Sequence, residues 1–467
     1  MSEVKLDDIV SLCKRRGFIY QGSEIYGGLA GTWDYGPLGA QLKRNISNLW
    51  WKTFVEDRDD AYGLDSAILM NQKVWQASGH VSGFNDPLFE CGNCKNRFRA
   101  DHLVEAWMEK HPKELAEAKV SAYAQSPEIL NEYKNVFKMS CPTCGKEQLS
   151  DVKQFNMMFK THVGAVEDET SVSYLRPETA QGMFVNFKNV VDSFYPDIPF
   201  AMVQMGKAFR NEIAPRDFIF RLRELEQMEI EVFIHPDTWK EQFDYWLEQQ
   251  KQFLLNLGLP EERIHQVEIG PEDRAHYSKH SVDTEYDFPF GQKELLGCAY
   301  RTDYDLSKHQ ASSGKNLEYR PKDGGAPYIP HVIEPTFGLD RLTLAVIATA
   351  YTEDEVNGEK RAFLKLPAHL APVKVAVLPL AKNKPELVAK AREVYAMLKK
   401  ELGAVLWVDT GNIGKNYRKM DEIGVPYCVT VDFETLEGDT ADTVTVRNRD
   451  TTEQRRVTID SLKDSLR

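Results

Sequence analysis

Apolar side chains recur at helical spacing in several long stretches of the chain. From about Ala40 they recur every three or four residues and predict a helix with one apolar face. That face comprises Leu42, Ile46, Leu49, Trp50 and Phe54. Helical patterns also cover Trp239–Leu257 and, after Gly338, the residues through Ala350. Short apolar runs typical of strands occupy Tyr174–Phe187, Phe200–Phe209 and Glu229–Ile234.

The pattern changes near Leu366, where Pro367 and Pro372 flank a hinge-like segment. An amphipathic helix is expected over Glu386–Leu402. Around it lie strand-like runs at Val373–Leu380, Val405–Val408, Tyr427–Val431, Thr443–Arg447 and Arg456–Ile459. Alternation of strands with helices predicts a small α/β domain at this end of the chain.

Composition and charge narrow the class of protein. The chain has 467 residues, of which 42% are hydrophobic and 28% charged, which excludes a collagen, a coiled-coil rod and a disordered chain. The net charge of −13 leaves room for nucleic-acid binding only through a local basic surface. Met1–Asp8 carries acids early and no apolar run follows, so we expect a cytoplasmic protein without membrane association. Leu342–Ala350 covers about half of a membrane span and predicts a buried core helix.

Four of the seven cysteines form two Cys-x-x-Cys pairs, Cys91 with Cys94 and Cys141 with Cys144. Each pair has the turn that lets two thiolates converge on one tetrahedral ion, and four protein ligands leave no open position. A structural zinc site is therefore favoured over unrelated buried thiols. A polar, helical stretch around Leu103–Tyr133 lies between the pairs. The remaining cysteines, Cys13, Cys298 and Cys428, are expected to be core residues.

Three segments carry charged residues in apolar surroundings. In Phe209-Arg210-Asn211-Glu212, the arginine and the glutamate lie two residues apart and share one face of a strand. An arginine there can grip a phosphate while the carboxylate accepts from an amino group, although a surface ion-pair ladder would look the same. Arg341 follows Gly338 at a helix start, a place suited to an anion, and Glu294 could bind Mg²⁺. The Walker pattern is absent from the sequence, which argues against a P-loop enzyme.

These segments resemble motifs of a known family. Arg210–Glu212 followed by Arg221–Glu224 is similar to motif 2 of class II aminoacyl-tRNA synthetases, and Gly338–Arg341 to their motif 3. Further segments resemble the bacterial homodimeric glycyl-tRNA synthetases within that class. They are Ala77–His80, Phe84–Pro87, Tyr174–Gly182, Glu334–Gly338 and Gly414–Asp432. The resemblance runs nearly end to end and includes the cysteine pairs.

The resemblance implies a fold and an organisation. An α+β catalytic core, with an antiparallel sheet flanked by helices, is expected at 1–90 and 151–366. A zinc-bearing insertion would occupy 91–150, and an α/β anticodon-binding domain 367–467. The implied activity joins glycine to ATP as glycyl-adenylate and transfers glycyl to the 3′ end of tRNA(Gly). The implied partners are therefore ATP with Mg²⁺, glycine, tRNA(Gly) and a second copy of the chain.

The resemblance also implies roles for individual residues, with Arg210, Glu212 and Arg341 as the catalytic set. ATP would be bound by Arg210, Asn211, Glu212, Phe220, Arg221, Leu222, Arg223, Glu224, Leu225, Glu294, Leu295, Gly338, Leu339, Asp340 and Arg341. Glycine would be bound by Arg99, Glu178, Leu225, Glu226, Gln227, Met228, Glu229, Arg301, Glu334, Pro335, Thr336, Phe337 and Gly338. Magnesium would be held by Glu294 and Glu334, and zinc by Cys91, Cys94, Cys141 and Cys144.

Three alternatives remain at this point. One is a sister synthetase for another small amino acid, although Glu178, Glu229 and Arg301 together favour glycine. The chain could be a synthetase-like nucleic-acid-binding accessory protein that has lost catalysis, although such relatives are expected to lose their charged ligands first. Basic residues near the C-terminus could contact RNA or form a solvated face. These residues are Lys415, Arg418, Lys419, Arg447 and Arg449. One departure from the family is Leu225, where a phenylalanine that stacks on adenine is usual.

Overall fold

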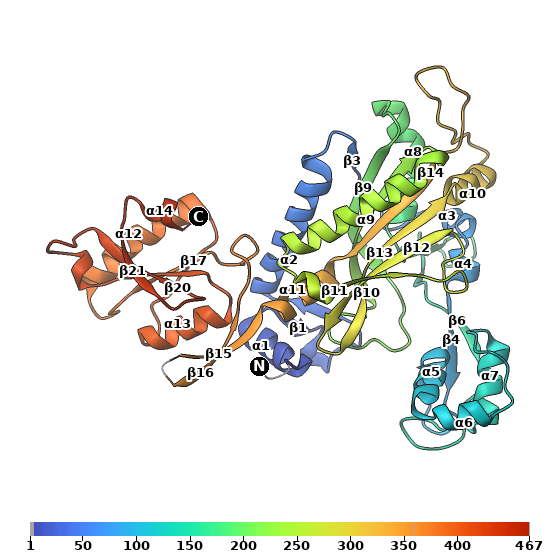
Figure 1. The fold of residues 1–467 in the computed structure, drawn as a ribbon, viewed down its shortest axis with the longest axis horizontal. Helices are drawn as coiled ribbons and strands as arrows, with labels where there is room; N and C mark the ends of the chain where they lie inside the picture. The colour runs from blue at the N-terminus through green and yellow to red at the C-terminus, as the bar shows by residue number, and fades with distance from the viewer. Residues whose placement is uncertain (1–3, 357, 467) are drawn as a thin grey trace.

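The computed structural model describes residues 4–356 and 358–466. A seven-stranded sheet forms its centre, in the order β11-β12-β13-β14-β10-β9-β3 (Figure 1). Neighbouring strands are antiparallel, except that β3 runs parallel to β9. The strands are β3 (Ala61–Gly63), β9 (Phe200–Phe209), β10 (Glu224–Ile234), β11 (Ile264–Glu268), β12 (His280–Phe288), β13 (Gly291–Thr302) and β14 (His331–Gly338).

Helices cover both faces of this sheet, as the alternation of side chains along the strands requires. On β10, Met228 and Ile230 belong to a large core with α1 (Leu6–Arg16), α2 (Pro37–Trp51), α9 (Trp239–Asn256) and α11 (Leu339–Ala350). Phe233 faces the other way, into a smaller core with α8 (Ala180–Phe194) and α10 (Tyr304–Ser313). Glu229 and Glu231 alternate with Met228 and Ile230 and so share the face of Phe233.

The helices predicted near Ala40, over Trp239–Leu257 and after Gly338 are confirmed as α2, α9 and α11. The strands predicted at Phe200–Phe209 and Glu229–Ile234 are confirmed as β9 and part of β10. The prediction of a strand over Tyr174–Phe187 is wrong, because only β8 (Val172–Tyr174) is extended and α8 begins at Ala180. The buried residues Met183, Phe184, Phe187 and Val190 have the three- and four-residue spacing of a helix face.

The C-terminal part forms a separate five-stranded sheet in the order β18-β17-β19-β20-β21, which confirms the α/β expectation. Its elements are β17 (Val375–Pro379), α12 (Pro385–Leu402), β18 (Val405–Trp407), α13 (Ile413–Glu422), β19 (Tyr427–Val431), β20 (Thr443–Asn448), β21 (Gln454–Thr458) and α14 (Leu462–Ser465). The hairpin of β15 (Tyr351–Val356) and β16 (Glu359–Leu364) joins it to the central sheet.

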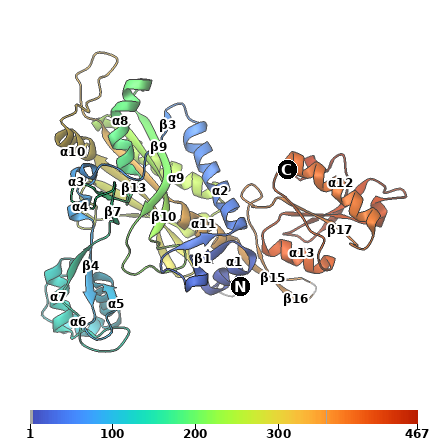
Figure 2. The same ribbon diagram turned by 180° about the vertical axis from the view of Figure 1, so that it is seen from behind.

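The segment that carries the cysteine pairs forms a lobe of its own, far from the C-terminal unit in both views (Figures 1 and 2). Its sheet has the strand order β5-β4-β6. Because β4 ends before residue 91 and β6 begins after residue 150, the sheet includes two strands from outside the expected insertion. The strands are β4 (Asn85–Glu90), β5 (Arg97–Arg99) and β6 (Lys153–Asn156), and the helices α5 (Ala100–Lys110), α6 (Pro112–Glu117) and α7 (Pro127–Val136). The predicted helical stretch is therefore three helices rather than one. Small elements complete the fold: β1 (Ile19–Gln21), β2 (Trp33–Tyr35), α3 (Gln72–Ala77), α4 (His80–Gly83) and β7 (Lys160–His162).

Candidate functional site

Two adjoining cavities open on the central sheet at the ends of β9, β10, β13 and β14. The first, of about 150 Å³, contains most residues of the two charged motifs. The second, of about 270 Å³, contains the buried acids of β10 and β14. Arg210, Gln227, Glu294, Gly297 and Thr336 line both cavities, so the two form one continuous site.

The first cavity is organised around Arg341, which lies in the first turn of α11. Its guanidinium lies 4.4 Å from the ring centre of Phe220 and pairs with Glu294 at 3.0 Å. Opposite, Arg221 lies 3.8 Å from a carboxylate oxygen of Glu212. Predicted residues that line this cavity are Arg210, Glu212, Phe220, Arg221, Leu222, Leu225, Glu226, Gln227, Glu294, Leu295, Thr336, Gly338, Asp340 and Arg341. The arrangement can receive an anion together with a flat apolar group.

The second cavity contains an acid cluster built around one buried arginine. Arg301 donates to both oxygens of Asp305, at 2.7 and 2.9 Å, and to Glu334 at 2.7 Å. Tyr277 packs against the guanidinium with its ring centre 3.7 Å away. Predicted residues that line this cavity are Glu178, Arg210, Gln227, Glu229, Glu294, Glu334 and Thr336.

Two further acids of the cluster are held by uncharged or switchable partners. Glu178 accepts from Gln181 at 3.0 Å and lies 3.2 Å from His80. One oxygen of Glu229 accepts from the backbone N–H of Thr179 at 2.9 Å and from its hydroxyl, and the other accepts from Gln227 at 3.0 Å. These contacts orient both carboxylates without neutralising the cluster.

The acids of the cluster differ in the direction in which their surroundings shift the pKa. Burial opposes ionisation of Glu178, but His80 and Arg301 hold the pKa of that carboxyl well below its usual range. Burial raises the pKa of Glu229, and the negative charge of Glu178 adds to the rise. Burial also raises the pKa of Glu334 to about 8, despite Arg301. The pKa of Glu231 is raised well above its ordinary value by burial and by Glu334. The cluster therefore carries fewer charges than it has carboxyl groups and favours a positive ligand.

Several predicted residues are engaged elsewhere. Arg99 pairs with Asp86 at 2.6 Å and with Asp101, outside both cavities. Arg223 donates to the backbone carbonyls of Glu212 and Ala30, and Glu224 pairs with Lys207 on the surface. Asp340 reaches the first cavity, yet its oxygens hold Tyr35 at 2.6 Å and Lys43 at 3.1 Å. The backbone N–H of Asn211 donates to Met157. Also outside the lining of both cavities are Asn211, Met228, Arg301, Pro335, Phe337 and Leu339. Met228, Phe337 and Leu339 lie in the large core, and Arg301 is buried against Asp305 and Glu334.

The two predicted magnesium ligands are far apart along the sheet. Glu334 pairs with Ala299 in the ladder of β14 and β13, five residues after Glu294. At about 3.3 Å per residue the two positions are separated by roughly 16 Å, too far for one ion. Asp283, which the motifs did not indicate, lines the second cavity with Glu294. Burial and the charge of Glu294 raise the pKa of Asp283 to about 7.

Sequence reasoning missed the loop between β11 and β12 and the helix after β13. Ile269, Asp273, Arg274, Ala275 and Tyr277 of that loop line the second cavity. Asp305 and Gln181 meet below it, at 2.8 Å. Asp305, on α10, follows Arg301, on β13, across a change from strand to helix, so no periodic spacing in the sequence indicated this pair.

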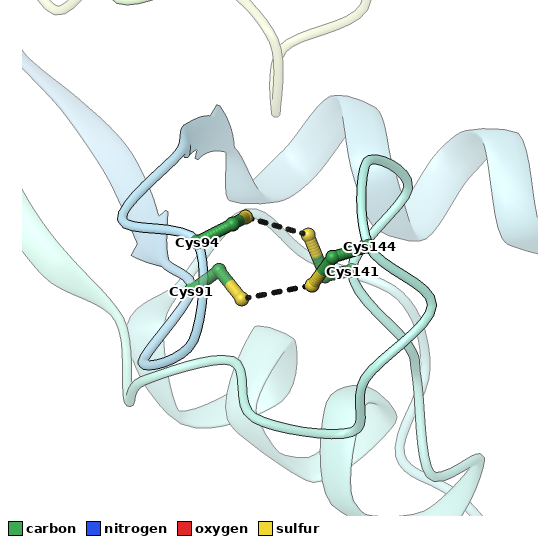
Figure 3. A group of neighbouring side chains, drawn as sticks. All are labelled: Cys91, Cys94, Cys141 and Cys144. Atoms are coloured by element: carbon green, nitrogen blue, oxygen red, sulfur yellow. Dashed lines mark hydrogen bonds between the residues drawn. The ribbon is translucent and has the colours of Figure 1, made fainter.

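The four paired cysteines meet in the lobe, with their Sγ atoms all within 4.8 Å of one another (Figure 3). Cys91 lies 3.6 Å from Cys144, and Cys94 lies 3.6 Å from Cys141. Four thiolates about 2.3 Å from a tetrahedral ion lie about 3.8 Å apart, close to these values. Each pair forms the same turn, since the backbone N–H groups of Lys95 and Gly145 donate to the first cysteine of their pair. The group can hold a metal ion.

The basic residues near the C-terminus do not form one exposed face. Arg447 pairs with both oxygens of Asp421 at 2.7 and 2.9 Å and is buried. Arg449, also buried, donates to the carbonyls of Gly424 and Leu366, each at 2.9 Å. These two arginines hold the C-terminal unit together and are unavailable to RNA. Among the helices of residues 4–356 and 358–466, none combines the length and the apolar composition that crossing a membrane requires.

Comparison with known proteins agrees with this geometry. Residues 374–467 match the model of the anticodon binding domain family. The glycine--tRNA ligase of Clostridium kluyveri is 51% identical over 466 residues, covering 100% of this chain and 98% of the relative. That of Clostridium acetobutylicum is 50% identical, covering 99% and 98%. That of Lachnospira eligens is 48% identical, with the same coverage.

The fold also has a solved neighbour, prolyl-tRNA synthetase of Giardia lamblia in complex with prolyl-adenylate. The TM-score is 0.66 at 15% identity, and the match covers 98% of this chain and 74% of the neighbour. At that identity the likeness concerns the fold alone, and it fits the antiparallel sheet expected of class II. Half of the residues are identical to those of the curated relatives over the whole length, so the chain belongs to the glycine--tRNA ligase family of class II aminoacyl-tRNA synthetases.

Proposed function

We propose that the chain activates glycine with ATP and transfers the glycyl group to the 3′ end of tRNA(Gly). In the first step a glycine carboxylate oxygen attacks the α-phosphorus of ATP, and pyrophosphate leaves. In the second, a terminal ribose hydroxyl of the tRNA attacks the glycyl carbonyl, and AMP leaves. The observation that carries the proposal is the continuity of the two cavities through Arg210, which lines both.

Arg210 is assigned to the α-phosphate because of this position between the cavities. Its Nε donates to the carbonyl of Pro177 at 3.0 Å, which orients the guanidinium while its other N–H groups stay available. A fixed cation there stabilises the charge that develops in an in-line displacement. The first step needs no general base, because the glycine carboxylate is already ionised; in the second, the proton of the ribose hydroxyl leaves with the phosphate of AMP. Positioning and electrostatics supply the rate.

The adenine and the remaining phosphates are assigned to the first cavity. Arg341 and Phe220 provide a cation and an aromatic ring 4.4 Å apart, which suits a stacked base. Glu212 is assigned to the amino group of adenine, because one of its oxygens is buried without a hydrogen-bond partner among the described residues. Magnesium bound with ATP neutralises charge on the phosphates. Glu294 and Asp283 would hold it, since both line the second cavity where it adjoins the first.

Glycine is assigned to the second cavity. Its ammonium group fits among Glu178, Glu229 and Glu334, which line that cavity. Arg210, which lines both cavities, is the cation available for its carboxylate, because the buried guanidinium of Arg301 is paired with Asp305 and Glu334. Thr336 lines the wall, so a pocket filled as far as the α-carbon excludes larger amino acids by steric clash. A smaller competitor does not exist, and we infer that no editing site is needed.

The proposal also covers the domain boundaries, the metal site, the cellular compartment and the oligomeric state. We assign the catalytic core to 1–90 and 151–366, the insertion to 91–150 and tRNA anticodon binding to 367–467. Structural zinc is assigned to the four cysteines, whose thiols imply a reducing compartment, the cytoplasm. A homodimer is assigned to the face of α2 and the edge strand β3. Hollows of about 480 and 450 Å³ adjoin these two elements and support that choice.

The test is ATP–pyrophosphate exchange measured with a panel of amino acids, for the full chain and for Arg210→Ala. Exchange is expected with glycine alone, and the variant is expected to lose it while keeping its circular dichroism spectrum. Exchange with another amino acid would contradict the glycine assignment. The absence of any exchange would instead support a degenerate accessory protein. Metal analysis of the purified chain tests the zinc site, where one ion per chain is expected.

A further inference from the structure

A separate cavity of about 470 Å³ lies between α3, α8 and the end of α10. Three lysines line it, Lys73, Lys188 and Lys315, together with the apolar residues Val74, Val185 and Leu317. We call it the lysine cavity. It shares no lining residue with the two cavities of the candidate site. Its size falls within the range of about 300–1,000 Å³ that is usual for small-molecule sites.

The lysine cavity has an excess of positive charge. Lys188 pairs with Asp192 at 2.9 Å. Lys73 and Lys315 have no ion-pair partner within 4.0 Å among residues 4–356 and 358–466. Two uncompensated ammonium groups beside an apolar lining favour a ligand with an anionic end and an apolar body.

Hydrogen bonds connect the lysine cavity to the glycine pocket. His309 lines the cavity, is buried, and lies 2.8 Å by its Nε2 from Oε1 of Gln181. Gln181 donates its amide to Glu178 at 3.0 Å and to Asp305 at 2.8 Å. Because that amide nitrogen is the donor to two carboxylates, Oε1 must accept, and the proton of the His309 contact lies on Nε2. The Nδ1 atom of His309 is left for a group in the cavity.

We propose that the lysine cavity binds a small phosphate monoester with a compact apolar group, and that its occupancy strengthens glycine binding. The phosphate is held by Lys73 and Lys315, and its P–O–H group donates to Nδ1 of His309, which carries its own proton on Nε2. That bond fixes the imidazole of His309 and its Nε2–H contact with Gln181, whose amide orients Glu178 and Asp305 to receive the glycine ammonium group. The coupling rests on the proposed glycine pocket, whereas binding to the cavity does not.

A small molecule fits these observations better than RNA. The lysines surround a hollow with an apolar lining rather than form a row along a surface, and RNA-binding faces combine many cations with exposed stacking rings. The only aromatic side chain that lines the hollow among the described residues is the buried His309.

The experiment uses phenyl phosphate as the probe and phenol as its uncharged control. Binding to the full chain is measured by calorimetry, with and without saturating glycine, and the glycine KM is measured by ATP–pyrophosphate exchange. Phenyl phosphate is expected to bind and to lower the glycine KM about fivefold, without changing the KM for ATP. Linkage requires that glycine tighten phenyl phosphate binding by the same factor. Phenol is expected not to bind.

The variant Lys73→Glu/Lys315→Glu is expected to lose binding of phenyl phosphate and its effect on glycine. Lys113→Glu/Lys400→Glu changes the same charge at exposed positions elsewhere and is expected to keep both. Undiminished binding to the first variant would overturn the site. Binding without a change in glycine KM would overturn the coupling. A first variant that raises only the KM for tRNA would assign the lysines to RNA instead. If the unmodified chain showed no ATP–pyrophosphate exchange, that result would contradict the proposed function but not the binding site.

Discussion

Two regions of the molecule bury several charged groups each, and they pair them differently. In the C-terminal unit, Asp421 is fully buried and both its oxygens accept from Arg447, while one also accepts from Arg361 at 2.9 Å. In the acid cluster beside the glycine pocket, both oxygens of Glu231 are buried without a hydrogen-bond partner among the described residues. The same holds for the side-chain oxygen of Gln227. None of the unpaired buried side-chain atoms among the described residues lies beyond residue 366.

The buried charges of the C-terminal unit hold parts of the chain together, whereas the acids of the glycine pocket lack internal partners and are available to a positively charged ligand. Asp421, on α13, connects β16 to β20, so its partners come from both sides of the junction between the central sheet and the C-terminal unit. The acids near Arg301 exceed their internal cations. Burial of unpaired acids costs stability, and it is tolerated where a substrate supplies the missing partner.

The largest expected effect is on stability, at the junction. Asp421→Asn leaves Arg361 and Arg447 buried without their shared carboxylate charge. We expect a loss of about 3 kcal/mol in the free energy of unfolding of the C-terminal unit. The glycine KM in ATP–pyrophosphate exchange should stay unchanged, because the glycine pocket is remote. Denaturant unfolding and limited proteolysis measure the loss, with exposed Asp439→Asn as the control. Unchanged stability would mean that the buried ion pairs of Asp421 do not hold the C-terminal unit together.

The next effect is on activity, in the pocket. Glu229→Gln keeps the shape of the side chain but removes a charge assigned to the glycine ammonium group. A charged hydrogen bond contributes about 2–3 kcal/mol, so the glycine KM should rise about 30- to 150-fold with a small change for ATP. Stability should hold or increase, because repulsion from Glu178 is relieved. Exchange kinetics and thermal unfolding test this, with exposed Glu241→Gln as the control. Equal losses for glycine and ATP would take Glu229 out of the amino-acid pocket.

The two regions also differ in how far sequence could predict them. The family resemblance indicated Arg210, Glu212 and Arg341, and all three line the first cavity. The expectation that Arg210 and Glu212 share a strand face is wrong, because β9 ends at Phe209. Sequence reasoning could not identify Tyr277, which reaches Arg301 from a loop with no periodic pattern. Basic residues near the C-terminus suggested RNA contact or a solvated face, whereas Arg447 and Arg449 are buried. Their partners come from distant segments, and only the folded chain brings those together.

A weaker effect, dependent on pH, is expected at Glu231. The pKa of this carboxyl is raised in the folded chain, so folding favours its protonated form. That contribution to stability is complete below the unfolded pKa, near 4.5, and is lost as the pH rises through the folded pKa. Glu231→Gln remains neutral and escapes the loss. The variant should therefore match the parent near pH 4 and become more stable than the parent as the pH rises.

Thermal unfolding from pH 4 to pH 9 measures this difference, and exposed Glu437→Gln serves as the control. A constant difference between Glu231→Gln and the parent across that range would mean that Glu231 does not exchange its proton on unfolding. The acid cluster would then carry one more charge than the comparison assumes.

The smallest effect concerns ATP rather than glycine. Leu225 lines the first cavity at the position where the family resemblance implied a phenylalanine, so the base is expected to meet an aromatic ring at Phe220. Leu225→Phe adds a stacking surface worth about 0.5–1.5 kcal/mol, and the KM for ATP should fall about two- to tenfold. The glycine KM should not change, since Leu225 does not line the second cavity. Exchange kinetics decide it, and a rise in the KM for ATP would mean that the cavity is already filled by Phe220 and Arg341. A change in the glycine KM would show instead that the two cavities respond together to a substitution in one of them.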